Sequence, residues 1–290
     1  MAKISEWLSA GIFVSPKQFR KATDRLGGTA ANILRSNQEL FLLKLLKSER
    51  YQDARCLARF EHQVYSQNGE DGIIAEIFRR IGVTTRSFVE IGVGDGRENN
   101  TAFLLSQGWT GAWLDGDRRC ARAIRTSFST ALSSARLKFT EGFITAENVK
   151  GLLAAASAPL EPDLMSIDID RNTYYIWEAL GKYRPRVVVV EYNATMPAGL
   201  DWKVRYAADK WFDGSFYYGA SLKAFENLGK SRGYSLVGCD VCGVNAFFVR
   251  DDLLGDKFTG PYTAENHYEP PRYWLIRTAG HPRGFGEFEG

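Results

Sequence analysis

The sequence lacks several features that would place it in a class at once. It has no run of about 18 apolar residues, so we expect no membrane-spanning helix. Its 290 residues include only four cysteines, too few for a disulfide framework, and the first residues show no secretion signal. A cytoplasmic protein is therefore expected. A net charge of +3 is too small to indicate nucleic acid as a partner. Neither a P-loop nor a Ser-His-Asp arrangement is visible.

An apolar stripe runs through the N-terminal part of the chain. Residues 30–47 (AANILRSNQELFLLKLLK) place leucine and isoleucine at helical spacing, which predicts an amphipathic helix. We assign residues 1–64 to an N-terminal helical extension. The stripe either packs on the main domain, which we favour, or forms a homo-oligomer contact.

From residue 66 onward, apolar runs alternate with helical patterns. This alternation predicts an α/β fold: a Rossmann-like, seven-stranded, mostly parallel sheet with helices on both faces. The short turn between the last two strands makes them an antiparallel hairpin. We assign residues 65–250 to this domain and residues 251–290 to a tail that covers the active-site side. The expected strands are 87–93, 111–115, 136–144, 163–169, 186–192, 234–239 and 243–249, and the expected helices are 99–107, 117–127, 146–156, 173–182 and 221–234.

A glycine-rich turn follows the first strand. Gly92, Gly94 and Gly96 come directly after Glu90, and glycines let a ligand approach the main chain. Alone this pattern is weak, because an ordinary tight turn also uses glycine. The second strand ends at Asp115, whose carboxylate could accept hydrogen bonds from ribose hydroxyls, and Asp117 competes for that role.

Two acidic residues, Asp95 and Glu98, bracket the same turn. They would repel the pyrophosphate that a nicotinamide cofactor places on a helix N-terminus. A ligand with a positive end and no phosphate fits better, and S-adenosylmethionine, with its sulfonium and ammonium groups, meets that description. An NAD-type oxidoreductase remains the alternative enzyme.

At Glu90 to Gly96 (EIGVGDG), the sequence resembles motif I of the class I S-adenosylmethionine-dependent methyltransferases. Residues 65–78 (YSQNGEDGIIAEIF) and 108–117 (GWTGAWLDGD) are most similar to the FkbM-type branch. The resemblance implies that Glu90 and the glycines hold the methionine part, that Asp115 holds the ribose, and that Phe143 and Ile144 lie near the adenine. Gln67 either reaches the cofactor or merely enters the following helix.

Acidic and amide side chains end the fourth and fifth expected strands. Asp168 and Asp170 follow one strand, and Glu191 and Asn193 follow the next. Because these strand ends are neighbours in a parallel sheet, the side chains can converge. Clustered acids need a counter-ion, and a hard divalent cation such as Mg²⁺ or Mn²⁺ would supply it.

The same pattern resembles the metal-dependent sugar O-methyltransferases of the macrocin type. That resemblance implies Asp168 and Glu191 as metal ligands, Asn193 as a third ligand, and Asp170 as the general base. The chain departs from the pattern where Tyr192 replaces a second acid, and where Arg171 puts a cation beside the acids.

An ordinary structural alternative exists for these acids. Asp168 and Asp170 could cap the next helix while Glu191 pairs with Arg171. This alternative keeps a third function open, a cofactor-binding scaffold that has lost catalysis.

Other features are less specific. His267 lies in an aromatic and polar segment and is a candidate base, although a surface loop is the simpler interpretation. The Cys239-x-x-Cys242 spacing is a weak zinc signal, and two ordinary thiols are favoured. Aromatic residues between 202 and 218 could form a wall for a sugar ring or an ordinary core.

The sequence thus predicts a metal-assisted S-adenosylmethionine-dependent O-methyltransferase. The expected partner is a saccharide or glycoconjugate acceptor.

Overall fold

The computed structural model describes residues 16–275 and 284–286, with side chains from residue 27 onward. The chain divides into two compact units between Glu49 and Arg50, so residues 50–64 belong with the second unit. The first unit contains the helix α2 (Pro16–Leu46), which starts well before the predicted helix at residue 30. Among the described residues, no helix combines the length and the apolar character needed to cross a membrane.

The second unit is built on a seven-stranded sheet, as predicted. Its strand order is β3-β2-β1-β4-β5-β7-β6. Neighbouring strands from β3 to β5 are parallel, and β7 is antiparallel to both β5 and β6. The strands are β1 (Ser87–Ile91), β2 (Thr110–Asp115), β3 (Leu137–Glu141), β4 (Leu164–Ile167), β5 (Val187–Glu191), β6 (Tyr234–Cys239) and β7 (Asn245–Arg250).

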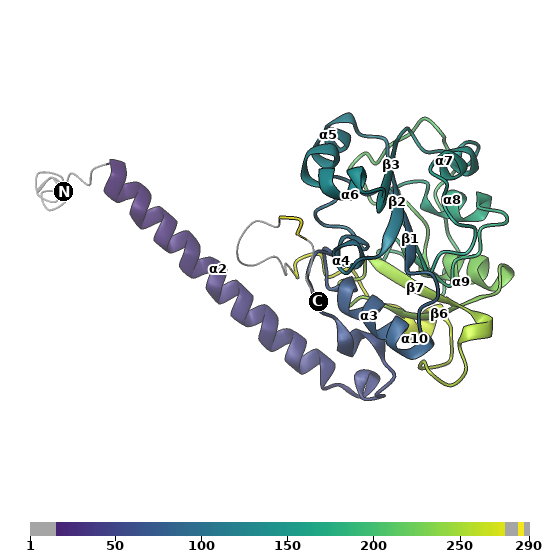
Figure 1. Ribbon diagram of the computed structural model, residues 1–290. Helices are drawn as coiled ribbons and strands as arrows, with labels where there is room; N and C mark the ends of the chain where they lie inside the picture. Colours follow the sequence, from purple (N-terminus) through teal and green to yellow (C-terminus); the bar gives the residue numbers. More distant parts are fainter. Residues whose placement is uncertain (1–15, 276–283, 287–290) are drawn as a thin grey trace, which may run out of the picture. The chain divides into compact units, whose positions relative to one another are not determined.

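Helices cover both faces of this sheet (Figure 1). One core forms against α7, α8 and α9, and the other against α3, α4, α5 and α6. The helices are α3 (Glu70–Ile81), α4 (Ala102–Ser106), α5 (Arg118–Ser127), α6 (Ser129–Ser133), α7 (Val149–Ala155), α8 (Thr173–Ala179), α9 (Leu222–Ser231) and α10 (Ala264–His267). Short 3-10 helices lie at Glu49–Tyr51, Leu57–Phe60 and Asp251–Leu253.

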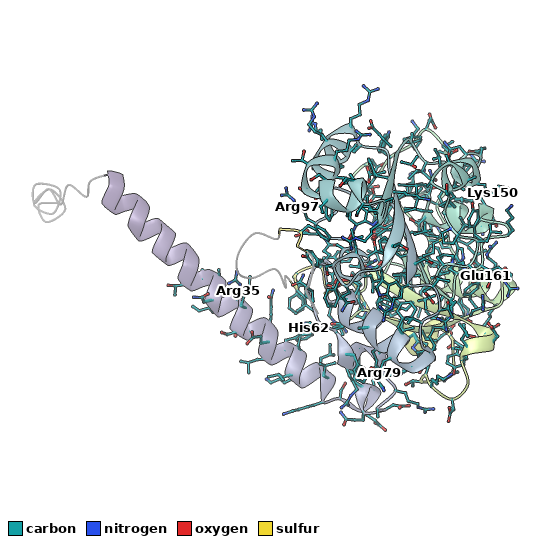
Figure 2. All side chains as sticks on the ribbon, in the orientation of Figure 1. Arg35, His62, Arg79, Arg97, Lys150 and Glu161 are labelled. Atoms are coloured by element: carbon teal, nitrogen blue, oxygen red, sulfur yellow. The ribbon has the colours of Figure 1, made fainter. Side chains whose placement is uncertain are left out.

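The valine run of β5 shows that helices cover both faces of the sheet. Val187 and Val189 pack in the core beside α3, and Val188 and Val190 pack in the opposite core. All four are fully buried, as expected for a strand covered on both faces. Charged side chains such as Arg97, Lys150 and Glu161 lie at the periphery (Figure 2).

The amino edge of the sheet is closed by one buried ion pair. Arg186 donates to the carboxylate of Asp163 at 2.6 Å, and that carboxylate also accepts the backbone N–H groups of Thr84, Thr85 and Arg86. These bonds tie the loop before β1 to the starts of β4 and β5. The carboxyl edge, by contrast, carries acidic residues at the ends of its strands, among them Asp115, Asp168 and Glu191.

Candidate functional site

The three glycines after β1 have similar backbones and different surroundings. All have positive φ: +83° at Gly92, +57° at Gly94 and +82° at Gly96. A side chain at Gly92 would meet the Asp168 carbonyl oxygen at 1.6 Å, and one at Gly96 would meet Phe128 and Trp113. A side chain at Gly94 would meet no described atom within 4 Å. Gly92 and Gly96 are therefore required by packing, and Gly94 leaves backbone open to a ligand.

Glu90, which the resemblance predicts to hold the methionine part of a cofactor, forms its hydrogen bonds with the chain itself. Its buried carboxylate accepts the backbone N–H groups of Asn100 and Thr101 and the Thr101 hydroxyl. Burial raises the pKa of Glu90 to about 7, and the Asp168 charge adds to it. Glu90 fixes the loop that leads into α4, and it fills the place where a phosphate would otherwise meet those N–H groups.

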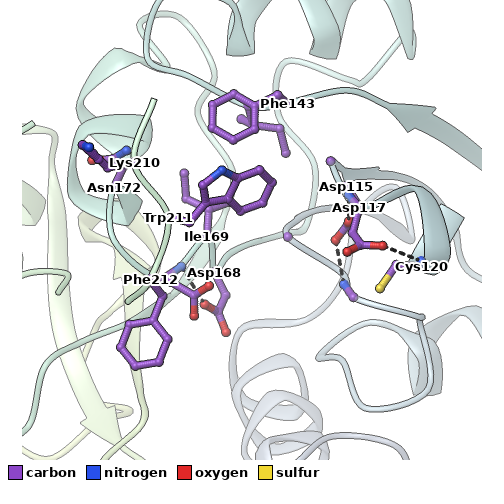
Figure 3. Close-up of a pocket in the computed structure, with 15 residues that line it drawn as sticks. Asp115, Asp117, Cys120, Phe143, Asp168, Ile169, Asn172, Lys210, Trp211 and Phe212 are labelled. Carbon is purple, nitrogen blue, oxygen red and sulfur yellow. Dashed lines mark hydrogen bonds between the residues drawn. The ribbon is translucent and has the colours of Figure 1, made fainter. Parts of the chain in front are cut away.

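A cavity of about 310 Å³ opens at the carboxyl edge beside the glycine turn (Figure 3). It brings together residues from the ends of β1, β2, β3 and β4 and from a loop before α9. Six predicted cofactor residues lie here. The lining residues are Gly92, Gly94, Asp115, Gly116, Asp117, Cys120, Phe143, Ile144, Asp168, Ile169, Asp170, Asn172, Lys210, Trp211 and Phe212.

The two aspartates after β2 have different tasks in this cavity. Asp115 is buried and accepts the backbone N–H of Gly94 at 2.8 Å and that of Asp117 at 2.7 Å, so it holds the glycine turn against β2. Asp117 is exposed and caps α5, accepting from Arg119 and Cys120. These helix N–H groups keep the pKa of the Asp117 carboxyl below its usual range.

One wall of the cavity is apolar. Phe143 and Ile144 follow β3, and Trp211 lies against Phe143 with ring centroids 4.8 Å apart. Trp211 and Phe212 come from the aromatic segment that sequence reasoning left undecided between substrate wall and core. Both are well exposed, at 62% and 46%, so they are not core residues. The wall suits a flat, weakly polar ring.

The three acids after β4 and β5 converge at one side of this cavity. Ligand atoms of Asp168, Asp170 and Glu191 all lie within 4.8 Å of one another. Asp170 has φ +57°, an uncommon conformation for a non-glycine residue that is often found at functional sites.

The charges of this acid cluster are unbalanced. Burial, and then the charge of Asp170, raises the pKa of Asp168, while burial and then the charge of Asp168 raise the pKa of Glu191. The Glu191 Oε2 atom is buried and has no hydrogen-bond partner. Oxygen ligands with an unpaired buried atom fit a hard divalent cation, which would remove the repulsion.

The simpler structural interpretation of these acids is wrong. The helix after β4 is α8, and its N-cap is Asn172; the hydrogen bond at the turn runs from the Ile169 N–H to the Thr173 hydroxyl. Arg171 turns away to the carbonyl oxygens of Tyr217 and Arg205. Within the described residues, Arg171 forms no ion pair with the acid cluster, so it does not neutralise it.

A second cavity, of about 470 Å³, meets the first at the acid cluster, because Asp170 and Phe212 line both. Gln67, predicted either to reach the cofactor or to lead into the next helix, lies here. Tyr218 and Tyr273 face each other with their hydroxyls 3.0 Å apart. The lining residues are Gln67, Asn68, Asp170, Glu191, Thr195, Phe212, Gly214, Ser215, Phe216, Tyr218, Val244 and Tyr273.

Two other predicted site residues, Asn193 and His267, lie in surroundings that do not favour their predicted roles. The Asn193 amide nitrogen donates to the carbonyl oxygens of Phe216 and Tyr218, and its oxygen accepts from Thr195, so no atom remains for a metal. His267 is buried in a separate cavity of about 110 Å³ with Arg50 and Glu269. Burial, and then the Arg50 charge, lowers the pKa of His267 to about 4. It is not a surface residue, and it lines a different cavity from the acids.

Known proteins give limited guidance. No family model and no curated protein matches this chain. Similar solved structures include a putative caffeoyl-CoA O-methyltransferase from Staphylococcus aureus, 14% identical, covering 74% of this chain and 99% of that chain with a TM-score of 0.44. Another is an S-adenosylmethionine-dependent methyltransferase from Clostridium acetobutylicum, 11% identical, covering 61% of this chain and 89% of that chain with a TM-score of 0.40.

Proposed function

We propose that this protein is an S-adenosylmethionine-dependent methyltransferase. The carrying observation is the first cavity, which combines an open glycine backbone, an apolar wall and several carboxylates at the carboxyl edge of the sheet. Such a lining suits a donor with an adenosine ring at one end and a cationic sulfur at the other. The donor would lie along Gly94 and Asp115, with its ring toward Phe143 and Ile144.

The same geometry disfavours a nicotinamide cofactor. α4 begins only at Ala102, and Glu90 already accepts the N–H groups of Asn100 and Thr101. Those two N–H groups are therefore not available to a pyrophosphate. Binding measured by calorimetry separates the two readings: S-adenosylhomocysteine should bind and NAD should not.

The methyl acceptor belongs in the second cavity, because that cavity meets the first at Asp170. We favour a saccharide hydroxyl. Aromatic faces from Phe212, Phe216, Tyr218 and Tyr273 suit a sugar ring. Among the described residues, the lining includes no lysine or arginine that would favour an anionic acceptor.

Asp170 is the proposed general base, since its carboxylate lies between the two cavities. An alcohol is a poor nucleophile until its proton leaves, and Asp170 is placed to receive that proton. Asp168 and Glu191 would hold a divalent cation, which when bound lowers the pKa of a coordinated hydroxyl.

Metal assistance has its own test. Treatment with EDTA should abolish methyl transfer to a sugar acceptor, and Mg²⁺ or Mn²⁺ should restore it. Full activity in EDTA would remove the cation and leave the methyltransferase proposal standing. Failure to bind S-adenosylhomocysteine would end both.

A further inference from the structure

Asn245 is a buried polar residue that the proposed function leaves unexplained. It begins β7, its side chain is only 5% exposed, and its Oδ1 atom has no hydrogen-bond partner. The remainder of β7 is apolar except for Arg250 at its end. A buried carbonyl oxygen without a partner is costly, so its position calls for a ligand or another reason.

The register of the sheet places Asn245 beside the acid cluster. Asn245 is paired directly with Glu191 across β5 and β7, and directly paired residues of antiparallel strands project to the same face. The neighbouring residues show which face this is. Val189 lies two positions before Glu191, and Phe247 lies two positions after Asn245. Both pack in the core beside α3. Both polar side chains therefore lie on the α3 side of the sheet.

The orientation of the Asn245 amide follows from its other contact. Its Nδ2 atom donates to Glu70 Oε1 at 2.8 Å, and Glu70 is fully buried at the start of α3. A carboxylate can only accept, so the amide nitrogen must face Glu70 and the oxygen must face the other way. Asn68 also donates to Glu70, at 3.2 Å from its side chain, which holds the carboxylate in place.

Two buried oxygens without partners thus belong to directly paired residues, Glu191 Oε2 and Asn245 Oδ1. Both oxygens lie on the α3 side of the sheet at its carboxyl edge, and a cation bound there would satisfy both. We infer that the Asn245 carboxamide oxygen is a further ligand of the divalent cation proposed above. This inference rests on the proposed metal assistance.

The test measures Mn²⁺ affinity by calorimetry in the whole chain, with no acceptor present. Asn245→Leu keeps the size of the side chain and removes its oxygen, so Mn²⁺ binding should weaken at least about tenfold. Asn245→Asp, which restores an oxygen, should bind Mn²⁺ more tightly than the leucine variant. Asn100→Leu is the control: it removes a buried amide that donates to the Ser166 hydroxyl and lines neither cavity, so it should leave Mn²⁺ affinity unchanged.

Two further measurements make the result decisive. S-adenosylhomocysteine affinity should be the same in all variants, which shows that they are folded. In the wild-type chain, Mg²⁺ should shift the NMR signals of the Asn245 side-chain amide and leave those of Asn193 in place, and this test applies even if a variant does not fold. Unchanged Mn²⁺ affinity in folded Asn245→Leu, or an Asn245 signal indifferent to Mg²⁺, overturns the inference. Wild-type protein that binds S-adenosylhomocysteine but no Mn²⁺ overturns it together with metal assistance, and leaves methyl transfer intact.

Discussion

Gly92 and Gly94 are two residues apart, and alanine should have different effects at the two positions. At Gly92 it should prevent folding, and at Gly94 it should weaken ligand binding. In Gly94→Ala the new methyl group enters open space, so the protein should fold with a loss of about 1–2 kcal/mol from the positive φ. The methyl group would stand in the proposed donor cavity, and S-adenosylhomocysteine affinity should fall at least about tenfold, equivalent to about 1.4 kcal/mol.

In Gly92→Ala the methyl group would overlap the Asp168 carbonyl, 1.6 Å away. No folded protein is expected, as judged by circular dichroism. If Gly94→Ala binds S-adenosylhomocysteine as tightly as the wild type does, the donor lies elsewhere.

Glu90 should make stability depend on pH between about 4.5 and 7. Its folded-state pKa is raised from 4.5 to about 7, mainly by burial, so the folded chain holds this proton more tightly than the unfolded chain. The resulting stabilisation is complete below pH 4.5 and is lost as the pH rises through 7; the shift corresponds to about 3 kcal/mol. Thermal unfolding of Glu90→Gln across this range should show a flatter profile than the wild type, whatever its absolute stability. Parallel profiles would contradict this assignment.

At the scale of elements, we expect the amino edge of the sheet to contribute to stability and the carboxyl edge to contribute to ligand binding. Asp163→Ala leaves the buried Arg186 charge and three backbone N–H groups without their acceptor, and should lower the free energy of unfolding by about 3–5 kcal/mol. Because Asp163 lies at the amino edge, S-adenosylhomocysteine affinity at a temperature where the variant is folded should not change. Chemical denaturation measures the change in the free energy of unfolding, and calorimetry measures the affinity for S-adenosylhomocysteine. A large loss of affinity in folded protein would mean that the edges are coupled.

The aromatic loop before α9 should contribute to donor binding without supporting the fold. Trp211 is exposed and contacts Phe143 across the cavity, so Trp211→Ala should weaken S-adenosylhomocysteine binding and leave the melting temperature unchanged. Trp177→Ala is the opposite control, because Trp177 is buried in the core and its loss should cost about 3–5 kcal/mol of stability. Equal S-adenosylhomocysteine affinity in Trp211→Ala and the wild type would exclude this loop from the donor site.

The sheet could be predicted because each strand is marked by a local run of apolar residues. A run such as 187–190, four valines buried on both faces, reads as a central strand without knowledge of its neighbours. Asn245 could not be found in this way, since its role depends on pairing with Glu191 across strands far apart in sequence. Its only local signal is a polar residue at the start of an apolar strand. The hydrogen bonds of Glu90 and Asn193 could not be predicted for a related reason, because loop geometry decides which backbone groups these side chains meet.

At the scale of the whole molecule, the division between Glu49 and Arg50 predicts that the second unit is self-sufficient. Both sheet cores and all residues of the two cavities lie after residue 50, and a unit with its own core can fold alone. A chain that starts at Arg50 should therefore keep its thermal stability and its S-adenosylhomocysteine affinity. If α2 joins two copies through the apolar stripe predicted at residues 33–46, light scattering should show a larger assembly for the full chain than for the shortened one. Weakened S-adenosylhomocysteine binding by the shortened chain would instead show that the first unit contributes to the donor site.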